Sequence, residues 1–239
     1  MSSDSQRPVL FFDIDNCLYP RSYRIQDHMQ SLIDSYFEHH LSLSPDDATL
    51  LHKRYYTDYG LALAGLVKHH KIDPLAYNAE VDDALPLDGI IKKDDGLRRL
   101  LQSFDRSKVK LWLFTNGYVT HAKRVVRLLG VEDQFEGITF CDYSRVPLVA
   151  KPHDEMFDKA ERQAGAPSGG GGCYFVDDSR LNCTAARARG WEVVWKVEEG
   201  DNPPEGEKEL RWVKKLQDLK NIWPGFFKAP DAEVANGSV

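Results

Sequence analysis

Two carboxylates stand directly after an apolar segment near the start of the chain, and this arrangement constrains the fold more than any other feature. Residues 9–12, Val-Leu-Phe-Phe, have the composition of a buried strand, and Asp13 and Asp15 follow at positions i and i+2. In open α/β sheets, ligands bind beyond the carboxyl ends of the strands. The pair is therefore placed to bind a divalent cation, to act as nucleophile and proton carrier, or to do both.

Two later apolar segments also end in polar residues. Residues 111–114 lead into Thr115-Asn116-Gly117, and residues 174–176 lead into Asp177-Asp178-Ser179. Each of these short motifs, taken alone, is typical of a turn or of a helix start. Because they occur at three strand ends, together with a Lys-Pro pair at 151, they indicate one shared site.

The chain after residue 89 alternates between short apolar segments and amphipathic ones. Apolar strands that alternate with helices predict a parallel sheet covered by helices on both faces. The predicted strands span residues 8–13, 109–114, 137–140, 173–177 and 191–197, and the predicted helices span 120–129, 153–164 and 180–189. The spacing of apolar residues predicts one more helix through Leu210, Val213, Leu216 and Leu219.

Residues 21–88 have a different pattern, in which apolar residues recur at helical spacing and no convincing strand is present. Met29, Leu32 and Ile33, for example, fall on one helical face. We expect this block to be an all-helical insert over the carboxyl edge of the sheet. The expected divisions are an α/β core, a helical cap and two disordered termini, with bounds 8–20 and 89–228, 21–88, and 1–7 and 229–239, respectively.

The polar motifs resemble, in their order along the chain, the four motifs of the haloacid dehalogenase superfamily of phosphohydrolases. They are Asp13/Asp15, Thr115, Lys151 and Asp177/Asp178. The resemblance implies a Rossmann-like core with a helical cap inserted just after the first motif. Four longer sequence segments resemble the fungal pyrimidine 5′-nucleotidases of that superfamily, and they lie at residues 13–19, 59–62, 81–83 and 141–144.

The resemblance also implies catalytic roles for these residues. Asp13 would attack phosphorus and form an aspartyl-phosphate, which divides the displacement into two easier steps. Asp15 would protonate the leaving oxygen and then take a proton from the water that hydrolyses the intermediate. The Thr115 hydroxyl and the Asn116 amide would hold the phosphoryl oxygens, and Lys151 would neutralise charge on the transferring group.

Mg²⁺ is the expected cofactor, because it prefers oxygen ligands and keeps several waters. The expected ligands are the Asp13 carboxylate, the Asp15 backbone carbonyl and an acid of the Asp177-Asp178 pair. Adjacent residues leave a strand end in opposite directions, so the two acids are expected to play unequal parts. Asp178 is favoured as the direct ligand, and Asp177 is either direct or water-mediated.

Substrate recognition is expected from the cap and from the loops that face it. The superfamily more commonly has Gly and Thr where this chain has Asn16 and Cys17; Asn16 could project towards the substrate, and Cys17 is expected to be a small buried residue. For Tyr55 and Tyr56, packing within the cap is favoured. The candidate substrate-binding residues are Asn16, Tyr19, Arg24, Tyr59, Asn116 and Gly117, with Asp142-Tyr143 as additions.

Composition narrows the classes of function and partner. A net charge of −6 argues against nucleic-acid binding, which depends on Lys and Arg that neutralise phosphates. The sequence has no run of 18 apolar residues, so no membrane span is predicted. Its four cysteines show no CxxC pair and no zinc-like spacing, and no apolar signal region stands at the start. We expect a reduced, cytoplasmic protein, with the nucleus as an open alternative.

The expected function is that of a Mg²⁺-dependent phosphomonoester hydrolase, and the resemblance favours a pyrimidine 5′-nucleotidase that acts on UMP and CMP. The expected partner is thus a small phosphorylated metabolite, a nucleoside monophosphate; the oligomeric state is left open. A broader sugar or lysophospholipid phosphatase, a phosphomutase and a catalytically silent regulatory module stay as alternatives. A dehalogenase is disfavoured, because Asp15 and the Asp177-Asp178 pair serve a metal that dehalogenation does not use.

Overall fold

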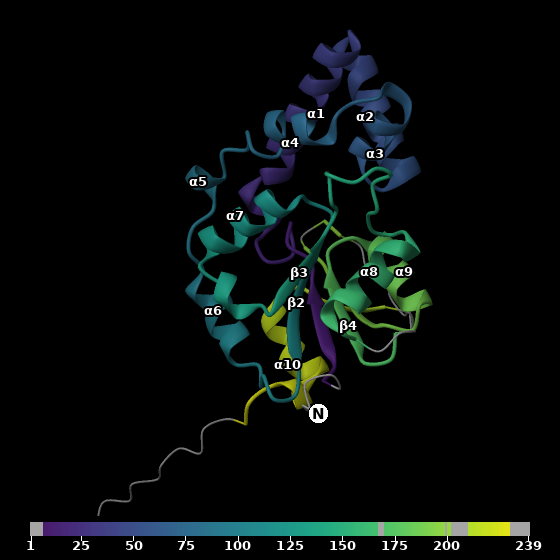
Figure 1. Cartoon of the computed structure of the whole chain (residues 1–239). Coiled ribbons are helices and arrows are strands. Elements are labelled where there is room, and N and C mark those ends of the chain that lie inside the picture. Colours follow the sequence, from purple (N-terminus) through teal and green to yellow (C-terminus); the bar gives the residue numbers. More distant parts are fainter. Residues whose placement is uncertain (1–6, 167–169, 199, 202–209, 230–239) are drawn as a thin grey trace, which may run out of the picture.

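The apolar segment that precedes Asp13 forms β1, a strand in the middle of the sheet (Figure 1). The computed structural model describes residues 7–166, 170–198, 200–201 and 210–229. In that part of the chain, parallel strands lie in the order β3-β2-β1-β4-β5-β6. Their bounds are β1 Val9–Phe12, β2 Lys110–Thr115, β3 Gly137–Phe140, β4 Cys173–Asp177, β5 Glu192–Lys196 and β6 Arg211–Val213. The predicted α/β fold with a parallel sheet is confirmed.

The register of the three central strands brings the polar motifs to one edge of the sheet. Phe12 of β1 pairs with Leu113 of β2 on one side and with Val176 of β4 on the other. The Asp13 N–H continues the ladder and donates to the Val176 carbonyl at 2.9 Å. Because the strands are parallel, their carboxyl ends coincide, and Asp13 lies between the ends of β2 and β4.

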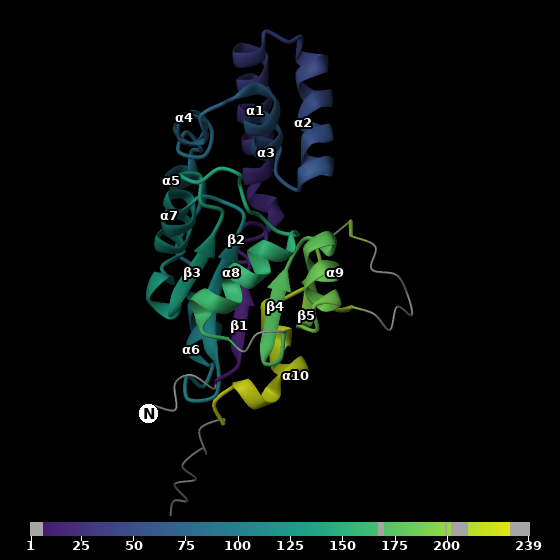
Figure 2. The same cartoon turned by 45° about the vertical axis from the view of Figure 1, so that its right-hand side comes forward.

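Helices cover both faces of the sheet (Figure 2), and the helices concerned are α6 Asp95–Gln102, α7 Val119–Leu129, α8 Asp154–Ala164, α9 Arg180–Ala188 and α10 Leu219–Ile222. Alternate side chains of β1 point to opposite faces, as a strand requires. Leu10 and Phe12 belong to a hydrophobic cluster with residues of α6, α7 and α10. Val9 and Phe11 belong to a second cluster with residues of α8 and α9. The apolar run thus forms a strand that is buried on both sides.

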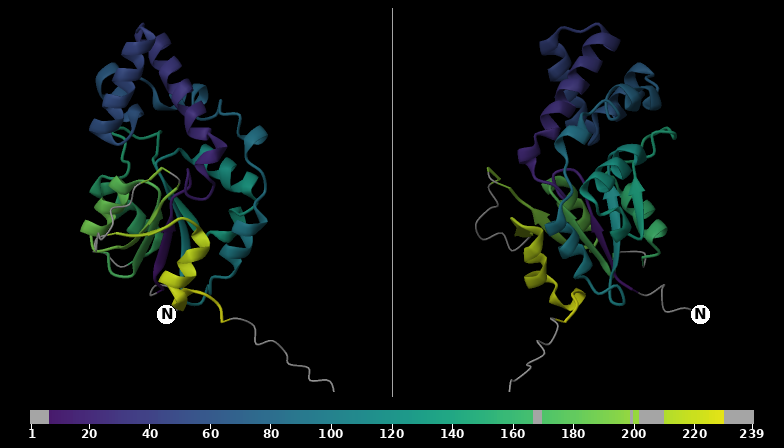
Figure 3. Two further views of the ribbon diagram at one scale, coloured as in Figure 1. Left: turned by 180° about the vertical axis from the view of Figure 1, so that it is seen from behind. Right: turned by 90° about the vertical axis from the view of Figure 1, so that its left-hand side faces the viewer.

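The segment between β1 and α6 is helical throughout its regular elements and stands beyond the carboxyl ends of the strands (Figures 1 and 3). These elements are the 3₁₀ helix Arg21–Tyr23, α1 Ile25–Leu41, α2 Pro45–Tyr59, α3 Ala62–His70, α4 Pro74–Glu80 and α5 Leu87–Ile90. Further 3₁₀ turns follow later in the chain, at Glu132–Gln134, Leu216–Asp218 and Pro224–Phe226. The insert therefore lies on the side of the sheet where the polar motifs gather.

The helical segment has a hydrophobic cluster of its own. Phe37, Leu63 and Leu66 lie at its centre, and Cys141 and Tyr143 from the loop after β3 join it. We propose the division into a core and a cap of residues 21–88 on this basis. The two ends of the insert are packed into the cluster of the sheet instead, through Ile25, Leu85 and Leu87.

The prediction of a helix through residues 210–219 is wrong in its first part. Residues Arg211–Val213 form β6, which pairs in parallel with the edge of β5, and only Leu219–Ile222 form an α-helix. The free hydrogen-bonding edge of β5 accounts for the difference, because a strand placed there satisfies backbone groups that a helix would leave open. Val213 and Leu216 are buried as the apolar spacing indicated, but in a strand and a 3₁₀ turn.

The sequence analysis also made predictions about the chain termini, the cysteines and membrane spans. Residues 1–6 and 230–239, most of the termini expected to be disordered, lie outside the described residues. Arg7 is described, and its guanidinium donates to Glu136 at 3.0 Å. All four cysteines are buried and free. Among the helices of the described residues, none is both long enough and apolar enough to cross a membrane.

Candidate active site

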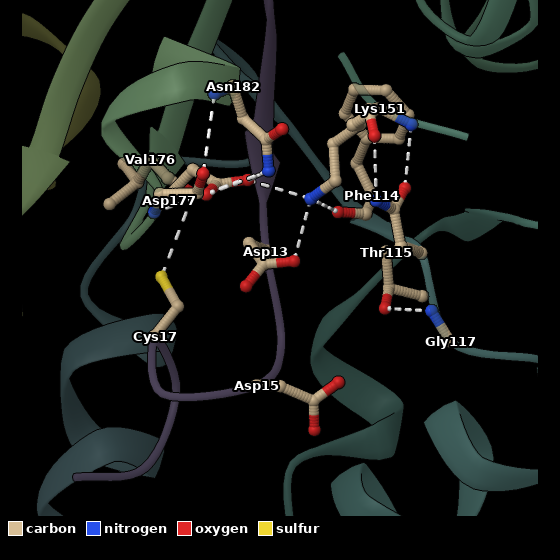
Figure 4. Close-up of polar contacts among 12 residues, drawn as sticks. Asp13, Asp15, Cys17, Phe114, Thr115, Gly117, Lys151, Val176, Asp177 and Asn182 are labelled. Carbon is tan, nitrogen blue, oxygen red and sulfur yellow. Dashed lines mark hydrogen bonds and ion pairs between the residues drawn. The ribbon is translucent and has the colours of Figure 1, made fainter. Parts of the chain in front are cut away.

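A buried lysine joins two carboxylates at the carboxyl edge of the sheet (Figure 4). The Lys151 Nζ donates to Asp13 Oδ1 at 2.7 Å, to Asp177 Oδ2 at 2.7 Å and to the Phe114 carbonyl at 2.8 Å. Only 1% of Lys151 is exposed. Burial alone would lower the pKa of Lys151, but the two carboxylates raise it above its ordinary value. The ammonium is therefore a fixed positive charge between the ends of β1, β2 and β4.

The neighbouring acids Asp177 and Asp178 have different surroundings. Asp177 is fully buried, and its Oδ1 accepts from the Ser179 N–H at 2.7 Å and from the Asn182 amide at 3.2 Å. Asp178 is partly exposed and lies 3.5 Å from the Arg21 guanidinium. Burial and the adjacent Asp177 raise the pKa of Asp178 to about 7. The oxygens of Asp177 are thus committed to protein donors, whereas Asp178 can offer an oxygen to a cation.

Three carboxylates lie close together where a metal ion could bind, and among them the oxygens of Asp177 are taken by protein donors. One oxygen from each of Asp13, Asp177 and Asp178 lies within 4.8 Å of the other two. The donor set consists only of oxygens, which suits Mg²⁺ and does not suit the softer metals that select thiolate or imidazole ligands. The residues present fit the expected cofactor.

Asp15 makes contacts that the sequence did not predict. Its Oδ1 accepts from the Tyr19 hydroxyl at 2.6 Å and from His121 Nε2 at 2.8 Å. Burial alone would raise the pKa of Asp15, but His121 and Tyr19 lower it below its ordinary value. Burial alone would lower the pKa of His121, and the carboxylates of Asp15 and Asp82 raise it to about 9. These three residues form a hydrogen-bonded unit beside Asp13.

The Thr-Asn-Gly motif organises the loop that carries Lys151. The Asn116 side chain accepts from the Lys151 N–H at 2.7 Å and donates to the Lys151 carbonyl at 2.9 Å. Thr115 Oγ1 accepts from the Gly117 N–H at 2.9 Å. The side-chain amide of Asn116 is therefore used within the protein, in bonds to the backbone of Lys151.

Gly60, which separates α2 from α3, also approaches the Lys151 loop. A β-carbon at this position would lie 2.9 Å from the Lys151 carbonyl and 2.9 Å from Pro152 Cδ, and its φ is +71°. We expect Gly60→Ala to lower the free energy of unfolding by about 2–5 kcal/mol, the sum of left-handed strain and overpacking, and to reduce turnover. Gly165 is the matched control, because its φ is +66° and nothing lies within 4 Å. If Gly60→Ala and Gly165→Ala lose the same free energy of unfolding in chemical denaturation, the close approach of Gly60 to the Lys151 loop is contradicted.

A cavity of about 550 Å³ opens above these groups, between the sheet edge and the helical segment. Of the predicted substrate-binding residues, Asn16, Tyr19, Asn116 and Gly117 line it. Asn16 has a φ of 57°, a left-handed conformation that Gly and Asn adopt most readily. The turn therefore accounts for an Asn at a position where the superfamily more often has Gly.

Arg24 and Tyr59 do not line the cavity. The Arg24 side chain is 77% exposed and pairs with Asp27, one helical turn away. The Tyr59 hydroxyl lies 2.7 Å from His69 Nε2, within the helical segment. Arg24 is the left-handed cap residue before α1, and Tyr59 is the last residue of α2, so each side chain contacts a neighbour within the helical segment and the prediction of these two as substrate-binding residues needs correction.

The remaining candidate residues, and one that was not predicted, can also be placed relative to the cavity. Arg21 lines the cavity, although Arg24 was the residue predicted to do so. Tyr56 also lines the cavity, although packing within the cap was favoured for it. Tyr55 is buried in the cap cluster as expected, and Tyr143 lines the cavity whereas Asp142 does not. Cys17 is buried, with its Sγ 3.6 Å from the Val176 carbonyl.

Sequence reasoning missed His121, Asp82, Arg21 and Asn182, all of which line the cavity or contact an acid of the site. His121 follows Thr115 by six residues on the first turns of α7, and this position after a strand-end motif is the signal that could have identified it. Asn182 stands similarly on the first turn of α9, after Asp177-Asp178.

Comparison with known proteins identifies the family of this chain. The family of haloacid dehalogenase-like hydrolases matches residues 8–190. A relative in Saccharomyces cerevisiae, "Phosphate metabolism protein 8", is 41% identical over 205 residues, which are 82% of this chain. The chain spans 64% of the length of that relative.

Solved structures share the fold at low sequence identity. A HAD phosphatase from Thermococcus onnurineus is 18% identical, with a TM-score of 0.57 over 93% of this chain and 100% of that one. The HAD-hydrolase YfnB from Bacillus subtilis, bound to magnesium, is 15% identical, with a TM-score of 0.56 over 90% and 98% of the two chains. L-2-haloacid dehalogenase from Xanthobacter autotrophicus is 16% identical, with a TM-score of 0.55 over 92% and 99%.

Proposed function

Because the chain belongs to the haloacid dehalogenase-like hydrolases, we propose that it hydrolyses phosphomonoesters in a Mg²⁺-dependent reaction at Asp13. The observation that carries this proposal is the buried ammonium of Lys151, which joins Asp13 to Asp177 beneath a cavity. A phosphate ester repels an attacking carboxylate, and a fixed cation beside that carboxylate offsets the repulsion.

The surrounding residues divide the reaction into two steps. In the first, the Asp13 carboxylate bonds to phosphorus while Asp15 gives a proton to the departing ester oxygen. In the second, Asp15 takes a proton from a water molecule that attacks phosphorus and releases Asp13. The Thr115 hydroxyl and the Asn116 backbone N–H would hold the phosphoryl oxygens through both steps.

Mg²⁺ would be held by the Asp13 carboxylate, the Asp15 backbone carbonyl and Asp178. When bound, it supplies positive charge that neutralises the phosphoryl oxygens. Asp177, whose oxygens are taken by Lys151, Ser179 and Asn182, would orient Lys151 and reach the ion only through water. This assignment follows from the different burial of the two adjacent acids.

The substrate proposed is a pyrimidine nucleoside monophosphate such as UMP or CMP. The sequence segments at residues 13–19, 59–62, 81–83 and 141–144, which resemble the pyrimidine 5′-nucleotidases, support this substrate. The cavity volume of about 550 Å³ lies within the roughly 300–1,000 Å³ that small-molecule sites occupy. Tyr56 lines the cavity and is 55% exposed, so its ring offers a face on which a base can stack. Tyr77 and Tyr143 also line the cavity but are buried.

The test is phosphate release from UMP, CMP, AMP, a sugar phosphate and a lysophospholipid phosphate, with and without Mg²⁺. Metal-dependent turnover with preference for UMP and CMP supports the whole proposal. Release without that preference keeps the hydrolytic mechanism and rejects the nucleotidase assignment. No release from any ester would favour the catalytically silent module. Transfer of the phosphoryl group to a sugar would favour the phosphomutase.

Removal of the metal is expected to stop the reaction and to lower thermal stability. Treatment with EDTA should reduce turnover by at least about 10²-fold, and Mg²⁺ should restore it. At about 100 times its Kd, the ion adds about 2.7 kcal/mol to the stability of the folded state, or about 5–10 °C in Tm for a chain of this size. Scanning calorimetry of wild type and Asp178→Asn with added Mg²⁺ checks this. The same Tm increase in the variant would contradict Asp178 as a ligand.

A further inference from the structure

Among the described residues, the side-chain hydrogen bonds to Asp15 all reach one of its two carboxylate oxygens, Oδ1. The Tyr19 hydroxyl and His121 Nε2 both approach Oδ1, at 2.6 and 2.8 Å. A carboxylate oxygen has two lone pairs in the plane of the group, so these two donors occupy the acceptor positions of Oδ1. His121 Nε2 must carry a proton to donate to a carboxylate, whether the ring is the neutral Nε2–H tautomer or the imidazolium.

The other oxygen, Oδ2, lies on the side of Asp15 where a phosphoryl group is expected. A β-carbon built on Gly117 would be 3.1 Å from His121 Cδ2, 3.4 Å from Thr115 Oγ1 and 3.8 Å from Asp15 Oδ2. The missing side chain of Gly117 therefore leaves open the space in which Oδ2 and the Thr115 hydroxyl meet. An ester bound to Thr115 would have its leaving oxygen beside Oδ2.

Both donors are fixed in place by burial. Tyr19 and His121 are each only 3% exposed. The Tyr19 ring stacks parallel to Tyr23, with the ring centroids 6.0 Å apart. His121 belongs to α7, whose Ala122 and Val125 are packed into the cluster beneath the sheet. Groups that are already in position need little rearrangement when the reaction occurs.

We propose that His121 and Tyr19 are positioning residues, which clamp Oδ1 of Asp15 so that Oδ2 alone exchanges protons with the substrate and with water. The inference rests on the proposed role of Asp15 as general acid and base. It assigns to Tyr19 the task of orienting Asp15, where substrate binding had been expected, and it gives a task to His121, whose Nδ1 finds no hydrogen-bond partner among the described residues.

The proton transfers can be written in full. As the bond from Asp13 to phosphorus forms, the bond from phosphorus to the ester oxygen breaks, and that oxygen keeps the electron pair and takes the proton from Oδ2. In the second step, a water oxygen bonds to phosphorus, its proton goes to Oδ2, and the bond from phosphorus to Asp13 breaks. Oδ1 keeps its two hydrogen bonds throughout.

The experiment compares two esters that differ in their need for an acid. An alkyl phosphate such as UMP, or another alkyl ester from the substrate panel, loses a poor leaving group that must be protonated. p-Nitrophenyl phosphate loses a phenolate that is stable without a proton. The value of kcat/KM reports the steps up to release of the alcohol, so it isolates the acid step from the later hydrolysis.

The expected result is a selective loss. His121→Leu should lower kcat/KM for the alkyl ester by about 10²-fold and Tyr19→Phe by about 10-fold, while both stay within about threefold of wild type on p-nitrophenyl phosphate, because general acid catalysis contributes roughly 10²–10⁴-fold. His121→Gln, which can still donate a hydrogen bond, should recover part of the loss. Asp15→Asn is the reference for full loss of the acid.

His40→Leu is the matched control, because His40 also bonds a carboxylate, Glu80 at 2.9 Å, but does not line the cavity. If His121→Leu lowers kcat/KM equally for both esters while its melting curve stays that of wild type, the clamp is rejected. If Asp15→Asn itself does not distinguish the esters, the proposed acid role fails and the clamp fails with it. If Asp15→Asn distinguishes them and the His121 and Tyr19 variants do not, only the clamp is overturned.

Discussion

Asp13→Asn is expected to lower phosphate release by at least about 10⁴-fold, the scale of loss found when a covalent nucleophile is removed. An amide oxygen is a poor nucleophile towards phosphorus and a weaker ligand for Mg²⁺. The fold should tolerate the change, since Asn keeps the shape of Asp and Lys151 keeps its bonds to Asp177 and to the Phe114 carbonyl. The substitution also removes one of three carboxylates whose oxygens lie within 4.8 Å.

The measurement combines phosphate release with thermal unfolding of the same samples in EDTA. We expect the Tm of Asp13→Asn to be equal to or above that of wild type, because crowding of like charges is relieved. Asp105→Asn is the control, since Asp105 accepts from Ser107 in the loop before β2, at the opposite end of the sheet. Turnover within tenfold of wild type would mean that Asp13 is not the nucleophile.

Lys151→Met is expected to damage both stability and activity. Its side chain has nearly the volume of Lys without the charge, so Asp13 and Asp177 would stay buried without their cation. Removing one partner of a buried ion pair costs about 3–5 kcal/mol, and loss of a preorganised positive charge at the phosphoryl group costs about 10²–10³-fold in kcat. Urea denaturation and phosphate release at saturating Mg²⁺ measure the two effects separately.

The matched control is Lys159→Met, because Lys159 also donates to a backbone carbonyl, that of Phe140 at 2.8 Å, but lies outside the cavity. Added Mg²⁺ should recover part of the stability of Lys151→Met, since the ion neutralises the same carboxylates. If Lys151→Met loses no more stability than Lys159→Met, Lys151 does not hold the acids together in the way its three hydrogen bonds indicate.

Much of the fold could be predicted because it depends on local patterns. Residues 9–12 are apolar at every position, and a strand of this kind must be covered on both faces, as β1 is by α6 and α7 on one side and α8 and α9 on the other. Helix spacing likewise predicted the helical insert. The prediction was wrong at residues 211–213, where apolar spacing fits a strand as well as a helix and the free edge of β5 decided the outcome.

Asp13, Thr115 and Asp177 of the candidate site could also be predicted, because each ends or follows a strand and parallel strands end together. Lys151 lies in the loop between β3 and α8, and it was expected from the family resemblance.

The substrate-facing residues could not be predicted. Arg24 and Tyr59 stand three residues after Arg21 and Tyr56, but both lie where a helix begins or ends. Arg24 is in a left-handed conformation just before α1 and pairs with Asp27, and Tyr59 is the last residue of α2 and contacts His69 of α3. Which face of the cap meets the sheet is decided by packing between the two.

The sequence alone determined the parallel sheet, the helical insert and the common edge at which Asp13 and Asp177 lie, since hydrophobic periodicity and chain order suffice for these. Lys151, in the loop after β3, was expected there from the family resemblance. Only the tertiary structure decided the contacts of Asp15 with His121, 106 residues away. The physical reason is that a hydrogen bond depends on positions to within a fraction of an ångström. Such positions are set by how α7 packs against the sheet, and no local pattern of residues encodes that distance.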